Sequence, residues 1–189
     1  MSPRLAREEG TTLIEVVISS AILVTLMAGL MSLAGLALNT TENQGHLAAR
    51  TTEYAQDKME QLLALAYGDP SSDTTVFPAV TTGGTGLTVG GSSNTSTPVT
   101  KYVDYLDQSG NLCGSASALA ASPSCAAPVG TTPPTNWFYQ RVWSVESSAT
   151  DATLPTNIKR ITVAATVSRG FGGGNKALSV LTVLKTSPF

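Results

Sequence analysis

Residues 16–41 form a continuous stretch without a charged side chain, and this stretch limits what the chain can fold into. Its most apolar part, Val16–Leu38, has 23 residues, and a helix of about 20 apolar residues crosses a bilayer. A core helix of a soluble protein shows a polar face, whereas this part offers only Ser, Thr and Gly. Arg4 and Arg7 precede it and should keep the start of the chain in the cytoplasm. The sequence therefore predicts one membrane-spanning helix.

A secretory signal peptide and a simple signal anchor are the alternatives to a functional membrane helix. The apolar region of a signal peptide usually has about 7–15 residues, but here it is longer, and the helical pattern continues through residues 46–67. Glu15 distinguishes the alternatives, because a charged group in a membrane segment costs at least about 2.5 kcal/mol and is usually functional. Because Glu15 lies at the start of the apolar run, an alternative is that it has no functional role and its side chain simply extends to the polar surface of the membrane.

The string Gly10-Thr11-Thr12-Leu13-Ile14-Glu15 follows a short charged leader, residues 1–10, and opens the apolar helix directly. This arrangement resembles the type IV prepilin signature. The resemblance implies that a prepilin peptidase cuts between Gly10 and Thr11 on the cytoplasmic side, and that the new N-terminus is methylated. It also implies that Glu15, the fifth residue of the mature chain, associates with a mature N-terminal amine during assembly, on its own or a neighbouring subunit. The chemistry agrees, because a buried carboxylate needs a cation.

The helix should continue beyond the membrane. We expect a transmembrane and assembly half, residues 11–38, and an amphipathic half, residues 39–68. The apolar residues of the second half share a helical spacing and should pack on a sheet: Leu47, Tyr54, Met59, Leu62, Leu63 and Ala66. Its charged residues should point outward: Glu42, Arg50, Glu53, Asp57 and Glu60. Gly68 and Pro70 form a stop signal, so the helix should end near Tyr67.

Residues 69–189 should form a β-rich globular head. The first part, 69–100, is rich in Gly, Ser, Thr and Pro and should be mostly loop. Alternating large and polar residues then predict strands at 101–106, 137–147, 157–169 and 175–186. A turn should follow the first strand at Gln108–Asn111, and Gly170–Gly174 should join the last two strands as a hairpin. The expected fold class is α+β, with the second half of the helix laid across one face of an antiparallel sheet.

The head shows a second resemblance. The motifs Tyr139-x-Arg141-x-Trp143-x-Val145 and Lys159-Arg160-Ile161-Thr162-Val163-x-x-Thr166-Val167 are similar to the head of V-type minor pilins and of the I-type pseudopilin of type II secretion. The family's major pilins often carry a proline within the long helix, whereas no proline lies between Pro3 and Pro70 here. This difference favours a minor subunit or pseudopilin.

Cys113 and Cys125 are the two cysteines of the chain. If the head lies outside the cytoplasm, a disulfide is the natural interpretation, and closing such a loop stabilises a fold by about 3 kcal/mol. Two unpaired thiols remain an alternative. A zinc site is disfavoured, because the one histidine, His46, is distant in sequence.

The sequence predicts no catalytic site, no metal site and no cofactor. One histidine gives little support to a His-based triad, and the Gly-rich segments lack the Lys and helix of a phosphate loop. Asp104, Asp107 and Asn111 could hold calcium, but turn formation is the favoured interpretation because their spacing does not match an EF-hand. The large aromatic residues should belong to the core or a subunit interface: Trp137, Phe138, Tyr139 and Trp143.

These observations favour a structural subunit over an enzyme. The expected protein is a minor type IV pilin or pseudopilin that assembles into, or primes, an envelope-spanning filament. Its expected partners are other pilin subunits through the N-terminal helix, a prepilin peptidase and an inner-membrane assembly platform. It should sit in a bacterial inner membrane with a periplasmic head before it enters a filament. The alternative is a tip adhesin or DNA-binding minor pilin, although a net charge of −2 and the lack of a basic run leave nucleic acid as a partner only for a DNA-uptake pilus.

Overall fold

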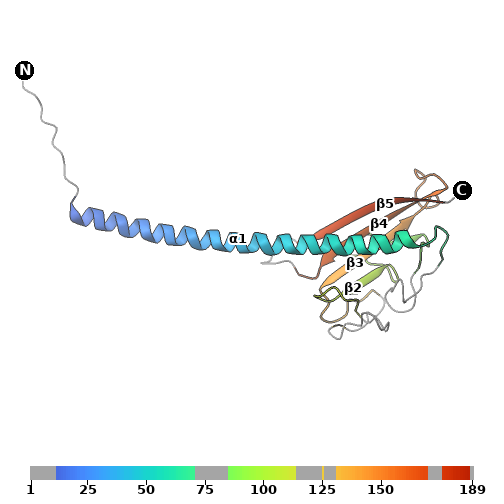
Figure 1. Cartoon of the computed structure of the whole chain (residues 1–189), viewed down its shortest axis with the longest axis horizontal. Helices are drawn as coiled ribbons and strands as arrows, with labels where there is room; N and C mark the ends of the chain where they lie inside the picture. Colours follow the sequence, from blue (N-terminus) through green and yellow to red (C-terminus); the bar gives the residue numbers. More distant parts are fainter. Residues whose placement is uncertain (1–11, 71–84, 114–124, 126–130, 170–175, 188–189) are drawn as a thin grey trace, which may run out of the picture. The chain divides into compact units, whose positions relative to one another are not determined.

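A computed structural model describes the chain at residues 12–70, 85–113, 125, 131–169 and 176–187. Its elements are α1 (Leu13–Ala64), β1 (Gly90–Gly91), β2 (Val103–Leu106), β3 (Tyr139–Glu146), β4 (Ile158–Val167) and β5 (Leu178–Thr186) (Figure 1). The chain divides into two compact units, residues 1–42 and 43–189, and α1 contributes to both. One long helix packs on a five-stranded antiparallel sheet, so the predicted α+β class is confirmed.

The sheet has β3 and β4 at its centre and β5 at one edge. At the other edge, β1 pairs with one end of β3 and β2 pairs with the other end. All pairings are antiparallel, and the three longest strands fall where the alternating residues predicted them. The first predicted strand begins at Val103 instead of Lys101, because the N–H of Tyr102 donates to the carbonyl of Val99 in a turn and Lys101 has a left-handed φ of 69°.

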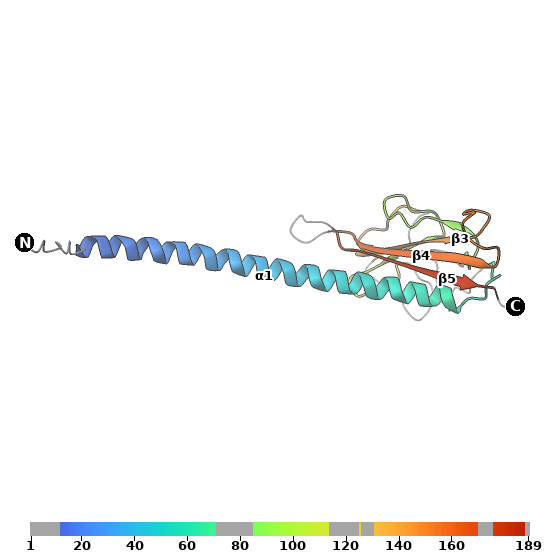
Figure 2. The same ribbon diagram turned by 90° about the horizontal axis from the view of Figure 1, so that it is seen from above.

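The second half of α1 covers one face of the sheet, as the periodicity predicted (Figure 2). Its side chains meet the odd-numbered residues of β3 and β4, because neighbouring strand residues point to opposite faces. The largest buried cluster comprises Ala55, Met59, Leu62, Leu87, Tyr102, Trp143, Val145, Ile161, Val163 and Ala165. The opposite face is covered near β2 by a second cluster: Val103, Tyr105, Cys113, Cys125, Val142 and Ala164. The sheet therefore has apolar packing on both faces.

The end of α1 differs from the prediction. The helix ends at Ala64 instead of Tyr67, and Leu63 and Ala66, expected to be buried, are exposed. Two lysines of the sheet provide the physical reason, because their ammonium groups donate to carbonyls in and just after the last turn. Lys185 donates to the carbonyls of Leu63 and Leu65, and Lys159 Nζ donates to the carbonyl of Tyr67 at 2.7 Å. Such lysine contacts satisfy carbonyls that a helix end leaves without partners.

An ion-pair network lies between α1 and the sheet, and the sequence did not predict it. Lys58 Nζ lies 2.6 Å from Asp104 Oδ2, and both side chains are fully buried. Arg141 bridges the same Asp104 oxygen at 3.1 Å and Asp57 Oδ2 at 2.6 Å. The Lys58 ammonium also lies 4.0 Å from the centre of the Trp143 ring, which is cation–π geometry. Two cations thus meet two anions, one of which, Asp57, remains largely in solvent.

The pKa of Lys58 is lowered from 10.5 to about 8, chiefly by burial; the Asp104 carboxylate opposes this change and the nearby Arg141 charge adds to it. Desolvation therefore outweighs the attraction of the carboxylate. Burial also raises the pKa of Tyr54, Tyr105 and Tyr139.

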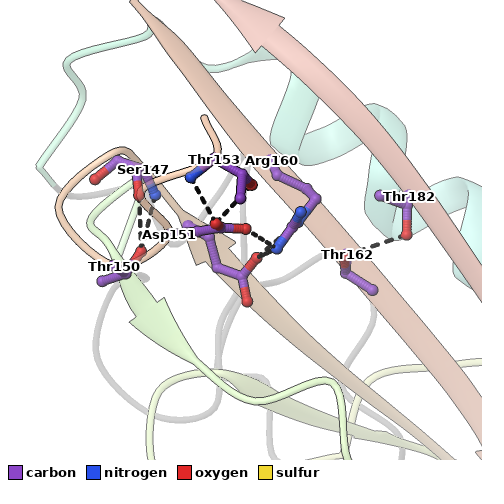
Figure 3. A network of polar contacts seen from close by, with 8 residues as sticks. Ser147, Thr150, Asp151, Thr153, Arg160, Thr162 and Thr182 are labelled. Atoms are coloured by element: carbon purple, nitrogen blue, oxygen red, sulfur yellow. Dashed lines mark hydrogen bonds and ion pairs between the residues drawn. The ribbon is translucent and has the colours of Figure 1, made fainter. Parts of the chain in front are cut away.

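The β3–β4 connection carries a second polar network on the surface of the head (Figure 3). Arg160 donates to Glu146 and to Asp151, each at 2.7 Å, and the hydroxyl of Thr153 donates to Asp151 at 2.6 Å. Hydrogen bonds from Thr153, and then from Arg160, lower the pKa of Asp151. These contacts attach the connection to β4 and pair the carboxylates of Glu146 and Asp151 with Arg160.

The head contains the predicted disulfide and the predicted turn. Cys113 and Cys125 form a disulfide, which confirms the expected pairing. Asp107 accepts the N–H groups of Ser109 at 2.8 Å and Asn111 at 2.9 Å, so these residues build the predicted turn. The predicted Gly170–Gly174 connection lies outside the described residues.

Candidate functional site

The first half of α1 is an apolar surface that no described residue covers. Every residue from Thr12 to Asn39 is exposed, and the large apolar side chains of this segment are 53–82% exposed. Soluble proteins rarely expose so large a continuous apolar area. The exposed surface therefore suits an apolar environment, such as a bilayer or other apolar helices.

The dimensions of this segment suit a membrane. The 23 residues Val16–Leu38 span about 35 Å as a helix, against about 30 Å for the hydrocarbon core of a bilayer. Within the described residues, α1 is long and apolar enough to cross a membrane, with a mean hydropathy of 2.3 over its most apolar window.

The hydroxyl groups of this segment are largely satisfied within the helix. Side-chain hydroxyls donate to carbonyls three or four residues earlier at Ser20, Thr25, Ser32, Thr40 and Thr41. An unpaired polar group in hydrocarbon costs several kcal/mol. These internal hydrogen bonds therefore lower the cost of placing Ser and Thr in lipid, and leave the carboxylate of Glu15 as the expensive group.

Glu15 lies in the first turn of α1. The N–H groups of Glu15 and Val16 donate to the carbonyl of Thr12 at 3.0 and 3.3 Å, which begins the helix. Thr12 and Glu15 have the spacing of a capping box, yet no hydrogen bond closes one, and no described residue pairs with the Glu15 carboxylate. The positive end of the helix dipole favours an anion here by up to about 1 kcal/mol, which is less than the cost of burying it.

The surroundings of Glu15 are small and accessible. Glu15, Val16, Ser19, Ser20 and Leu23 line a shallow groove along one side of the helix. Ser19, one turn after Glu15, is a small residue that lines the same groove. An amine carried by a neighbouring helix, or by the chain's own first residue, could approach this carboxylate from the groove.

Further along the same segment, two glycines have no packing role within the chain. A Cβ added to Gly29 or Gly35 would meet no atom within 4 Å, so the fold of the single chain does not require glycine there. In a helix each glycine costs about 1 kcal/mol relative to alanine. Small residues in apolar helices let a neighbouring helix approach closely, which offers a reason for their presence.

The structure locates the predicted site residues as follows. Gly10 and Thr11 lie outside the described residues. Glu15 lies on the exposed helix, as its place in the sequence indicated, and Cys113 and Cys125 are joined within the head.

The buried Lys58–Asp104–Arg141 network was missed, although a signal existed. Lys58 falls between Tyr54 and Leu62 at four-residue spacing, so it belongs to the core-facing side of the helix.

No family model, no curated protein and no solved structure matches the chain. The function must therefore be argued from the residues themselves. The features that bear on it are an exposed apolar helix, a carboxylate at its start and a β-rich head packed on the second half of the same helix.

Proposed function

We propose that this chain is a minor type IV pilin or pseudopilin, a structural subunit of an envelope-spanning filament. The observation that carries the proposal is Glu15, five residues after Gly10 and at the start of an uncharged, exposed helix. One long apolar helix packed on an antiparallel sheet is compatible with a pilin-like fold.

The proposed mechanism begins with cleavage after Gly10, which frees the α-amino group of Thr11. Thr11 and Glu15 are four residues apart, the distance at which groups on a helix become neighbours. The ammonium would neutralise the Glu15 carboxylate on the same chain, or on an adjacent subunit that is displaced along the filament. Since an unpaired charge in an apolar bundle is costly, the pair would favour one axial register between subunits.

The apolar half of α1 would hold the subunit in the inner membrane before assembly. In the filament, neighbouring helices would replace lipid around the exposed apolar side chains. The hydroxyls already bonded within the helix would not need new partners in either environment, so the transfer would leave them unchanged.

The second half of α1 would transmit force from the helix to the head during extraction from the membrane. The Lys58–Asp104 ion pair and the contacts of Lys159 and Lys185 fix this half on the sheet at both its middle and its end. The proposed partners are other pilin subunits, a prepilin peptidase and an inner-membrane assembly platform. The proposed location is a bacterial inner membrane with a periplasmic head, and then a filament.

The proposal is tested by Glu15→Ala in the natural host or in a heterologous bacterium with a complete pilus or pseudopilus machine. We expect the variant to be present in the membrane but reduced at least about tenfold in sheared or purified filaments, because its helix can no longer neutralise a partner amine. Glu60→Gln is the matched control, since Glu60 is an exposed acid of the same helix outside the apolar segment. Equal incorporation of Glu15→Ala and the wild type would refute the assembly role.

A further inference from the structure

A cleft of about 470 Å³ lies on the head and plays no part in the proposed assembly chemistry. It is lined by Thr95, Ser96, Pro98, Tyr105, Thr131, Thr132, Pro133, Trp137, Gln140, Thr166 and Lys176. These residues come from several segments distant in sequence. The volume is within the range of small-molecule sites, about 300–1,000 Å³.

The floor of the cleft is a row of three residues across the sheet. Tyr105 on β2 pairs with Gln140 on β3, and Gln140 pairs with Thr166 on β4. Their side chains lie on the face opposite the second half of α1, since Val103 and Val142 on that face pack in the cluster away from the helix. The cleft is therefore separate from the helix-packing surface.

Hydrogen bonds fix this floor before any ligand arrives. The hydroxyl of Tyr105 donates to the carbonyl of Thr131 at 2.9 Å, and Gln140 Nε2 donates to the Tyr105 hydroxyl at 3.4 Å. Thr166 donates its hydroxyl to the carbonyl of Ala177 at 3.0 Å. The Tyr105 ring meets the edge of the Trp137 ring, with the centroids 5.4 Å apart. A preformed site loses less entropy on binding.

One wall of the cleft is also held in place. Asn94 accepts the N–H of Ser96 on its side chain at 2.9 Å and the N–H of Thr97 on its carbonyl at 3.2 Å. This turn fixes the loop that carries Thr95 and Ser96. Thr132, from another segment of the lining, is exposed and adds a further hydroxyl group.

The side chains that line the cleft indicate the class of ligand that it could bind. The polar side chains are hydroxyls, one amide and the single ammonium of Lys176, and none of the described lining residues carries a carboxylate. The accessible hydroxyls, on Thr95, Ser96 and Thr132, can both donate and accept hydrogen bonds, which matches a ligand rich in hydroxyl groups. The half-buried ring of Trp137 offers apolar area to the C–H face of a sugar ring. Lys176 adds a charge-assisted contact for an anionic group.

We propose that this cleft binds an acidic saccharide, with the sugar ring against Trp137 and its carboxylate on Lys176. A phosphate ligand fits less well, because one lysine without an arginine or a glycine-rich loop provides few donors for it. The inference concerns the head alone and does not depend on filament assembly.

The test is a glycan array probed with the full chain in detergent micelles. The array should carry oligosaccharides that contain glucuronic, galacturonic or sialic acid, together with their neutral counterparts. We expect saturable binding to one or more acidic oligosaccharides, and titration calorimetry should then give the affinity. Lys176→Gln should weaken that affinity about tenfold, as expected for loss of a hydrogen bond to a charged group.

Lys101→Gln is the matched control, because Lys101 is an exposed lysine outside the cleft. Thr132→Val, a change of similar volume in the lining, should weaken binding several-fold and provides a second variant. The proposal is overturned if no acidic oligosaccharide binds, if neutral ones bind equally well, or if both cleft variants retain wild-type affinity.

Discussion

Asp104→Ala should destabilise the head strongly, because Asp104 is the shared anion of a buried network. Its Oδ2 lies 2.6 Å from Lys58 Nζ and 3.1 Å from Arg141 Nη2. The substitution would leave two cations side by side, with only the half-exposed Asp57 on Arg141 as a counter-charge. Breaking a buried pair in this way costs about 3–5 kcal/mol, which is a large share of the 5–15 kcal/mol or so that stabilises a typical domain.

Lys58→Met should behave differently. A pKa of about 8 instead of 10.5 means that the folded head disfavours the charged amine, relative to the neutral amine, by about 3 kcal/mol compared with water. Methionine removes this cost and fills similar space, while Asp104 keeps Arg141 as a partner. We therefore expect Lys58→Met to lie within about 1.5 kcal/mol of the wild type. The double variant Lys58→Met/Asp104→Ala should be at least about 2 kcal/mol more stable than Asp104→Ala alone, because it contains no buried lysine without a counter-charge.

The assay is urea unfolding of the full chain in mild detergent, followed by tryptophan fluorescence. Trp143 lies in the buried cluster beside Lys58, so its emission reports loss of this packing. A loss below about 1 kcal/mol for Asp104→Ala would refute the reasoning, and so would additive effects of the two substitutions.

Two further predictions concern stability. The free energy of unfolding should rise as pH increases from about 8 towards 10, because folded Lys58 releases its proton near pH 8 while the unfolded chain holds it to about 10.5. Burial also lowers the pKa of Lys159 and Lys185, so Lys58→Met should reduce the rise measured by urea titrations at fixed pH values without removing it, whereas an equal rise in the variant would assign it elsewhere. Gly91→Ala should cost at least about 2 kcal/mol, because Gly91 has a φ of +83° and an added Cβ would lie 2.3 Å from the carbonyl oxygen of Trp143. The control Gly68→Ala meets open space, and equal melting temperatures for the two variants would contradict this account.

Much of the fold could be predicted, because the relevant signals are periodic and local. The uncharged run predicted the apolar helix, and alternation predicted β3, β4 and β5. The short β1 strand was not predicted, since Gly90 and Gly91 carry no alternating pattern and their pairing with β3 depends on the Tyr102 side chain packed against them.

The buried charges could not be predicted from composition alone. Lysine is rarely fully buried without a partner. The partner of Lys58, Asp104, is 46 residues away in sequence, and Arg141, which shares that carboxylate, is 83 residues away. Only the folded sheet brings β2 and β3 under the helix at this position. The cleft was missed for the same reason, since its lining residues converge from distant segments.

The central claim is that the chain is cut after Gly10 so that the amine of Thr11 can neutralise Glu15. The most direct measurement is the intact mass of the protein isolated from membranes of a bacterium with an active prepilin peptidase, with Gly10→Val as an uncut control. We expect a wild-type mass that lacks residues 1–10, carries one added methyl group and is two hydrogens lighter because of the Cys113–Cys125 disulfide. A wild-type mass that still includes Met1–Gly10, equal in processing to the Gly10→Val control, would contradict it.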